Sequence, residues 1–164
     1  MAGLPANPAD IEHRLWDELE DHPVGMLTLE GALRHAQPMT AFVEREHRRL
    51  WFFSSNDTEL ARAAATSRPA LFTFQQRDLQ ASLSGHILAQ HDRRRMDRFW
   101  NAVVAAWHPG GKNDPKLTLL SMDCDDGEVW ISQAGPIRFA WEIAKANATR
   151  RHPALGGHAH LDFH

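Results

Sequence analysis

The chain has 164 residues, a formal net charge of −3 and a single cysteine, Cys124. This length suits one domain with its own core, and one cysteine excludes an intramolecular disulfide framework. The charge gives no broad basic surface for nucleic acid, and no apolar run approaches the roughly 20 residues that cross a bilayer. We therefore expect a cytoplasmic domain that binds neither nucleic acid nor membrane.

In chain order, the sequence predicts a mainly β protein with flanking helices. A first helix is expected from the cap Asn7 to about Pro23, and a later one behind the cap Asp92, extending to Trp107. Strands are expected over residues 24–29, 32–43, 49–54, 70–74, 79–90, 117–124 and 128–132, the last two as a hairpin around 125–127, and shorter helices over 58–67 and around 137–144. The short connections favour an antiparallel barrel or a strongly curled sheet.

Residues 49–62 place an aromatic strand, a polar turn and a helix start in immediate succession. Ser54 and Ser55 end the strand, and Thr58 stands where the helix begins. Hydroxyls and free backbone N–H groups at such a junction favour phosphate binding, which makes a phosphorylated cofactor the first hypothesis. The alternative is an ordinary capping turn, since Ser and Thr also favour that position, with the aromatic residues serving only to pack the sheet.

Four motifs in a fixed order carry a resemblance to a known family. They are Gln37-Pro38-Met39-Thr40, Leu50-Trp51-Phe52-Phe53-Ser54-Ser55, Gln80 with Ser84-Gly85, and the segment from Ala106 to Leu117. Together they resemble the FMN-binding split barrels related to pyridoxamine 5′-phosphate oxidase, and within these the general stress protein subgroup. The similarity covers about residues 11–145.

The resemblance implies an α+β fold built on a six-stranded antiparallel split barrel, over residues 1–148, that forms a homodimer with FMN in a groove between protomers. A redox or general stress role is implied, with an unknown small-molecule substrate, and pyridoxamine phosphate oxidation itself is not expected. The implied cofactor-binding residues are Gln37, Pro38, Met39, Thr40, Phe53, Ser54, Ser55, Thr58, Arg62 and Gln80.

Two positions depart from the family pattern at the phosphate end. Gln37 stands where the family usually has Arg, and Leu60 where it usually has Lys or Arg. A charge-assisted hydrogen bond contributes roughly 1.5–3 kcal/mol, so losing one such cation weakens FMN binding by roughly ten- to a hundredfold. Arg62 is the substitute cation, although two helix positions further on it faces a different side.

The histidines support a competing class of function. Four of the eleven, His152, His158, His160 and His164, lie in residues 149–164, which we expect to be a flexible tail. Neutral imidazole binds zinc, copper and haem iron, so a haem- or metal-binding split barrel is the alternative, and a cofactor-free interaction module is the third reading. No zinc-ligand spacing and no hydrolase, P-loop or Rossmann motif is present, so no metal ligand or catalytic residue is assigned.

Overall fold

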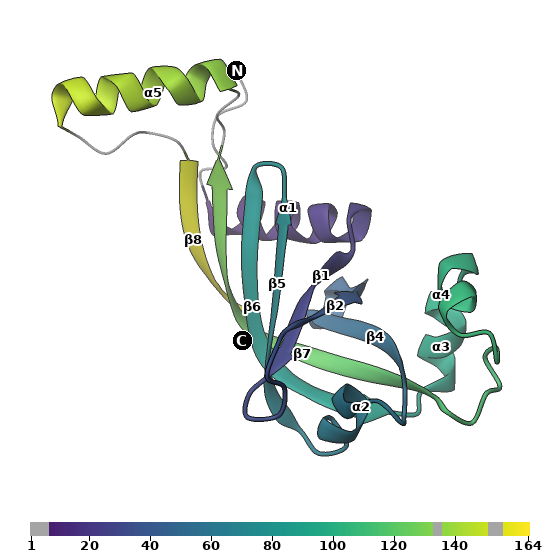
Figure 1. Cartoon of the computed structure of the whole chain (residues 1–164). Helices are drawn as coiled ribbons and strands as arrows, with labels where there is room; N and C mark the ends of the chain where they lie inside the picture. Colours follow the sequence, from purple (N-terminus) through teal and green to yellow (C-terminus); the bar gives the residue numbers. More distant parts are fainter. Residues whose placement is uncertain (1–6, 133–135, 151–155) are drawn as a thin grey trace.

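The computed structural model describes residues 7–132, 136–150 and 156–164, and its body is a strongly curled antiparallel sheet (Figure 1). The strands are β1 (Val24–Leu29), β2 (Gln37–Thr40), β3 (Phe42–Glu44), β4 (Arg49–Ser55), β5 (Arg68–Gln76), β6 (Leu79–Gln90), β7 (Leu117–Ser132) and β8 (Gly156–Asp162). The helices are α1 (Pro8–Asp21), the 3₁₀ helix η1 (Arg45–His47), α2 (Glu59–Ala63), α3 (Arg93–Phe99), α4 (Ala102–Trp107) and α5 (Pro136–Thr149).

The sheet has the strand order β2-β1-β5-β6-β7-β4-β3, with β8 beside β7. β7 organises it, because its first half pairs with β4, its second half with β8, and its whole length with β6. The bulge between Ser84 and Gly85 requires glycine, since a Cβ at Gly85 would lie 1.9 Å from the Asp123 carbonyl oxygen. The predicted mainly β, antiparallel α+β class is confirmed, with eight strands in place of six.

The sheet encloses a main core and carries a second, smaller core at one end. The main core lies between α1 and the inner face of the sheet and includes Leu15, Leu19 and Phe72, all fully buried. The second core packs Trp51 and Phe53 of β4 against Met96 of α3. The aromatic residues of β4 therefore serve in packing, as the simpler reading of that strand predicted.

The predicted caps of α1 and α3 are confirmed. The side chain of Asn7 accepts a hydrogen bond from the backbone N–H of Asp10, and that of Asp92 accepts one from Arg95. The helix expected to continue to Trp107 is instead two helices, because Asn101 caps a new one by accepting from Val104 N–H. On that second helix Trp107 is 79% exposed, so its ring is not part of the core.

The strands expected over 32–43, 117–124 and 128–132 need correction. The strand expected over 32–43 divides into β2 and β3, and begins only at Gln37, after a turn at Gly31 with φ of +69°. The hairpin expected around 125–127 is absent because β7 runs straight through it, with the side chains of Asp125 and Asp126 bonded to His86 and Ser84 of β6. These cross-strand contacts outweigh the local turn tendency of Asp-Asp-Gly.

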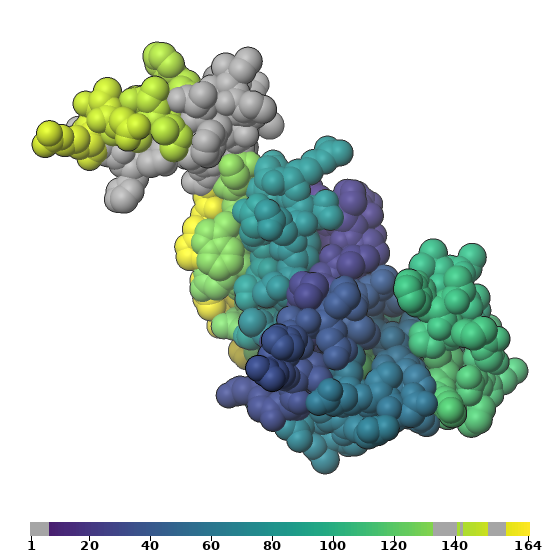
Figure 2. Space-filling model, in the orientation of Figure 1, coloured from purple at the N-terminus to yellow at the C-terminus, as the bar shows by residue number. Residues whose placement is uncertain are grey.

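The segment expected to be a flexible tail contributes β8 to the sheet. Residues 156–162 pair with β7 in antiparallel register. Leu161 and Phe163 are buried, and the Phe163 ring lies 5.5 Å from that of Trp16 on α1. These apolar side chains hold the end of the chain against the main core, whereas α5 projects beyond the sheet (Figures 1 and 2). Within the described residues no helix is both long and apolar enough to cross a membrane.

Candidate functional site

The turn between β4 and α2 is held by its own hydroxyl groups. The Ser54 and Thr58 hydroxyl oxygens are 3.1 Å apart, and the Thr58 hydroxyl donates to the Ser55 carbonyl at 2.9 Å. Thr58 also accepts from the backbone N–H of Ala61, so it is the cap of α2. The capping reading of this turn is therefore correct, and a phosphate role for it depends on the charges beside it.

Two cations lie beside this turn. The Arg62 guanidinium donates to the backbone carbonyl of Asp57 at 2.6 Å, so its long side chain reaches back to the start of α2. The Lys116 ammonium lies 3.5 Å from the Asp57 carboxylate, and the Lys116 carbonyl accepts from Asn56 N–H. A hydrogen bond from Ser55 and the charge of Lys116 lower the pKa of Asp57. We call Ser54, Ser55, Thr58, Arg62 and Lys116 the charged turn.

Burial of position 60 explains why α2 carries Leu60 there and not the cation usual in the family. Its side chain is buried in the main core, where an unpaired charge would be strongly unfavourable. Arg62 was expected to face away from the turn. Its long, flexible side chain nevertheless bends back from the other helix face and reaches the turn. The positive charge thus comes from Arg62, two residues further along α2, and from Lys116, the residue directly before β7.

The predicted residues of β2 lie on the edge strand of the sheet, beside β1. In the pairing with β1, Thr40 lies opposite Val24 and Pro38 opposite Met26, and β2 also contacts β4. Met39 packs on the main core and Gln37 is half-buried at the edge.

Phe53, predicted to contact the cofactor, is committed to the second core. Its ring lies 5.5 Å from that of Phe42 and 5.8 Å from that of Trp100, both edge to face. The side chain is buried. Within the protomer it can therefore support the turn after β4 but presents no ring face to a ligand.

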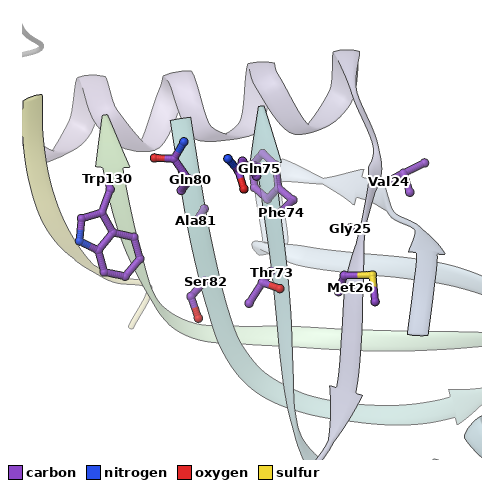
Figure 3. Close-up of a pocket in the computed structure, with 10 residues that line it drawn as sticks. All are labelled: Val24, Gly25, Met26, Thr73, Phe74, Gln75, Gln80, Ala81, Ser82 and Trp130. Carbon is purple, nitrogen blue, oxygen red and sulfur yellow. The ribbon is translucent and has the colours of Figure 1, made fainter. Parts of the chain in front are cut away.

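Gln80 lies in a pocket of about 440 Å³ on the outer face of the sheet, the face turned away from α1 (Figure 3). We call this the outer pocket. Its lining residues are Val24, Gly25, Met26, Thr73, Phe74, Gln75, Gln80, Ala81, Ser82 and Trp130. The volume is within the usual range for small-molecule sites, and apolar walls with a few polar groups are typical of them.

The strand register explains how the outer pocket forms. Gln75, Gln80 and Trp130 are directly paired across β5, β6 and β7, and Met26 is paired with Thr73. Because alternate residues of a strand share a face, these side chains all point outward. Met26 and Trp130 remain 42% and 44% exposed, which leaves apolar surface open to a flat partner.

The structure separates the charged turn from the outer pocket. Ser55 is paired with Leu117 at one end of β7, whereas Gln80 is paired with Trp130, 13 residues further along it. This corresponds to roughly 40 Å along the strand. Ser54 lies on the inner face of β4, which it shares with residues of the main core, whereas Gln80 faces outward. No residue of the charged turn lines the outer pocket.

Most residues of these two regions were missed by the sequence reasoning, among them Lys116, Met26, Gln75 and Trp130. Lys116 could have been found from its place directly before Leu117, at the end of the last family motif. Met26 and Trp130 gave no local signal, because their role depends on pairing with β5 and β6.

One carboxylate–histidine cluster and the single cysteine bear on other possible functions. Glu44, Glu46 and His47 bring potential metal ligands together, but burial of Glu44 is outweighed by hydrogen bonds from Arg95 and Trp51, which lower its pKa to about 2. That carboxylate is already neutralised by the guanidinium. Burial raises the pKa of the Cys124 thiol to about 12, so this cysteine is not a thiolate nucleophile.

Comparison with known proteins identifies the family of the chain. The family model described as pyridoxamine 5′-phosphate oxidase like matches residues 10–154. The chain therefore belongs to the pyridoxamine 5′-phosphate oxidase-like family. Comparison with curated proteins finds no match.

Three solved structures show the relationship in more detail. A protein from Jannaschia sp. CCS1, described as a general stress protein 26, is 36% identical, with a TM-score of 0.79 over 94% of this chain and 99% of that one. A general stress family protein from Xanthomonas campestris is 37% identical, with a TM-score of 0.73 over 79% and 92%. The general stress FMN/FAD binding protein of Xanthomonas citri is 36% identical, with a TM-score of 0.72 over 77% and 92%.

The two regions have the chemistry that a flavin nucleotide needs. The charged turn offers two cations for a phosphate, and the outer pocket offers a tryptophan, a methionine thioether and side-chain amides for a flat heteroaromatic ring. Neither region alone supplies both the cations for the phosphate and the surface for the ring. The residues therefore fit FMN when the two regions are combined.

Proposed function

We propose that the protein binds FMN at a site completed by two copies of the chain. In this proposal the outer pocket of one protomer holds the ring, and the charged turn of its partner holds the phosphate. The observation that carries it is that the two regions lie at opposite ends of β7, and no residue of the charged turn lines the outer pocket. A homodimer supplies both regions within reach of one ligand.

Each region has a defined task in the proposed site. The side-chain amides of Gln75 and Gln80 can donate to and accept from the polar edge of the ring, while Met26 and Trp130 exclude water from its face. Arg62 and Lys116 neutralise the phosphate. When bound, the flavin supplies the electron or hydride transfer.

Family membership supports this proposal. The Xanthomonas citri relative is a general stress FMN/FAD binding protein, and the Jannaschia relative is described as a general stress protein 26. We infer for this chain a flavin-dependent redox role in stress physiology, with a small-molecule substrate.

The test is a titration of freshly purified, untagged protein with FMN, followed by flavin fluorescence and by light scattering for molecular mass. The proposal predicts a dimer with saturable binding of one FMN per chain. A monomer, or no saturable binding, contradicts it. A Soret band in the absorption spectrum of the purified protein would favour the haem alternative instead.

A further inference from the structure

β8 brings two histidines to one carboxylate on the outer face of the sheet. His158 and His160 are two residues apart on the strand, so both side chains point to the same side. The Nδ1 of His160 lies 2.9 Å from one oxygen of Glu128, and the Nε2 of His158 contacts the other oxygen. One carboxylate thus bridges two imidazoles from a neighbouring strand.

A second carboxylate and an aromatic ring complete this cluster. Asp126, two residues before Glu128 on β7, has an oxygen 3.8 Å from the Nε2 of His160. The Trp130 ring stacks on the His158 ring, with centroids 5.2 Å apart and planes 19° apart. Stacking fixes the imidazole plane, which reduces the conformational entropy that ligand binding would cost.

The cluster is open to ions from solution. The side chains of His158 and His160 are 53% and 54% exposed, and that of Glu128 is 39% exposed. Two imidazoles and a carboxylate are a ligand set that zinc and other first-row divalent ions take, with water at the remaining positions.

Other histidine–carboxylate pairs in the described residues lack this combination. His86 lies 2.9 Å from Asp125 with a single imidazole. His47 contacts Glu44, whose carboxylate is also bound by the Arg95 guanidinium at 2.9 Å, a cation that would repel a metal ion. The cluster on β7 and β8 has two imidazoles and two carboxylates, and no Lys or Arg of the described part of the chain pairs with these carboxylates.

We propose that His158, His160 and Glu128 form a binding site for a divalent transition metal ion, of which Zn²⁺ is the probe. After small rotations of the two rings, the ion takes the place of the protons that now link the imidazoles to the carboxylate. Asp126 is available as a further oxygen ligand. The bound ion ties β8 to β7. It also adjoins the outer pocket, because Trp130 belongs to both.

The test is isothermal titration calorimetry of the full-length chain, without a purification tag, with ZnCl₂. Wild type should bind one Zn²⁺ per chain. His158→Gln and His160→Gln should each weaken binding about tenfold or more, and the double variant should abolish it. His86→Gln is the matched control, since it removes an exposed histidine paired with a carboxylate, and should bind as wild type does.

Two further measurements keep the outcome interpretable. Far-UV circular dichroism and Tm should be unchanged in the variants, because the altered side chains are half exposed; if β8 detaches, Glu128→Gln on the central strand β7 provides the same test. Co²⁺ should give visible absorption bands in wild type that the double variant lacks. Wild-type-like Zn²⁺ binding by the double variant and by Glu128→Gln, or equal weakening by His86→Gln, overturns the proposal. FMN titration is a separate readout, so its failure would leave this one standing.

Discussion

The two ends of β7 differ in the chemistry that they present. At the Leu117 end, the charged turn has cations and hydroxyl groups but its aromatic neighbour Phe53 is packed into the second core. At the Trp130 end, the outer pocket has a hollow with apolar walls and side-chain amides, but no cation among its lining residues. The difference teaches that cations and apolar ring-binding surface lie in different regions of the protomer, which is why the proposed FMN site requires assembly of two copies.

Among single substitutions, the largest effect on FMN binding is expected at the charged turn. Arg62→Gln removes a charge-assisted contact to the phosphate and should weaken FMN binding roughly ten- to a hundredfold. Riboflavin, which lacks the phosphate, should bind equally well to the variant and to wild type. Fluorescence titrations with both ligands measure this, with Arg98→Gln, an exposed arginine on α3, as control. Equal losses for both ligands would place Arg62 outside the phosphate site.

The stability of the contact between β3, α3 and the second core depends on Glu44. Its carboxylate accepts from Arg95 at 2.9 Å and from the Trp51 indole at 2.6 Å. Glu44→Gln should therefore lower the free energy of unfolding by about 2 kcal/mol near neutral pH, measured by urea denaturation.

The pH dependence of this loss has a definite sign. Since the folded-state pKa of Glu44 is about 2 against an ordinary value of 4.5, its contribution is complete above 4.5 and fades as the pH falls toward 2. The difference between wild type and Glu44→Gln should shrink over that interval. A difference that is constant with pH would show that charge is not its cause.

A smaller effect, independent of the phosphate, is expected at the outer pocket. Trp130→Ala removes the aromatic wall and should weaken FMN and riboflavin alike, by roughly tenfold. Trp107→Ala is the control, because Trp107 is an exposed tryptophan on α4, outside the outer pocket. A loss confined to FMN would contradict the assignment of the ring to this pocket.

The smallest effect is a gain. Gln37→Arg restores the basic residue usual in the family at a half-buried position of the edge strand β2, and should tighten FMN binding by up to about tenfold. Gln37→Met, of similar length and without charge, should give no gain. An unchanged affinity in both variants would mean that β2 does not reach the phosphate.

Local signals in the sequence predicted those parts of the fold that depend on neighbouring residues. The caps Asn7 and Asp92 and the alternation of residues 79–90 all gave correct elements. β8 could not be predicted in this way, because histidine and glycine obscure its alternation and its stability comes from pairing with β7 and from burial of Leu161.

The same distinction applies to the candidate site. Ser54, Ser55 and Thr58 form a contiguous turn, so the sequence predicted the region as one unit, and the reach of Arg62 needed only a side-chain conformation. The outer pocket joins β1, β5, β6 and β7, and Gln80 alone was predicted there. Its partners Met26 and Trp130 become neighbours only through strand pairing over long distances in sequence.

The most direct test of a site shared between two copies is complementation. Chains carrying Arg62→Gln and chains carrying Trp130→Ala are co-expressed with two different tags, and the mixed dimers are isolated. If the site is shared, each mixed dimer has one wild-type site and should bind one FMN with wild-type affinity. A dimer of wild type with the double variant should then bind none at that affinity. The reverse result, no wild-type site in the first dimer and one in the second, would show that each protomer holds its own flavin and would contradict this account.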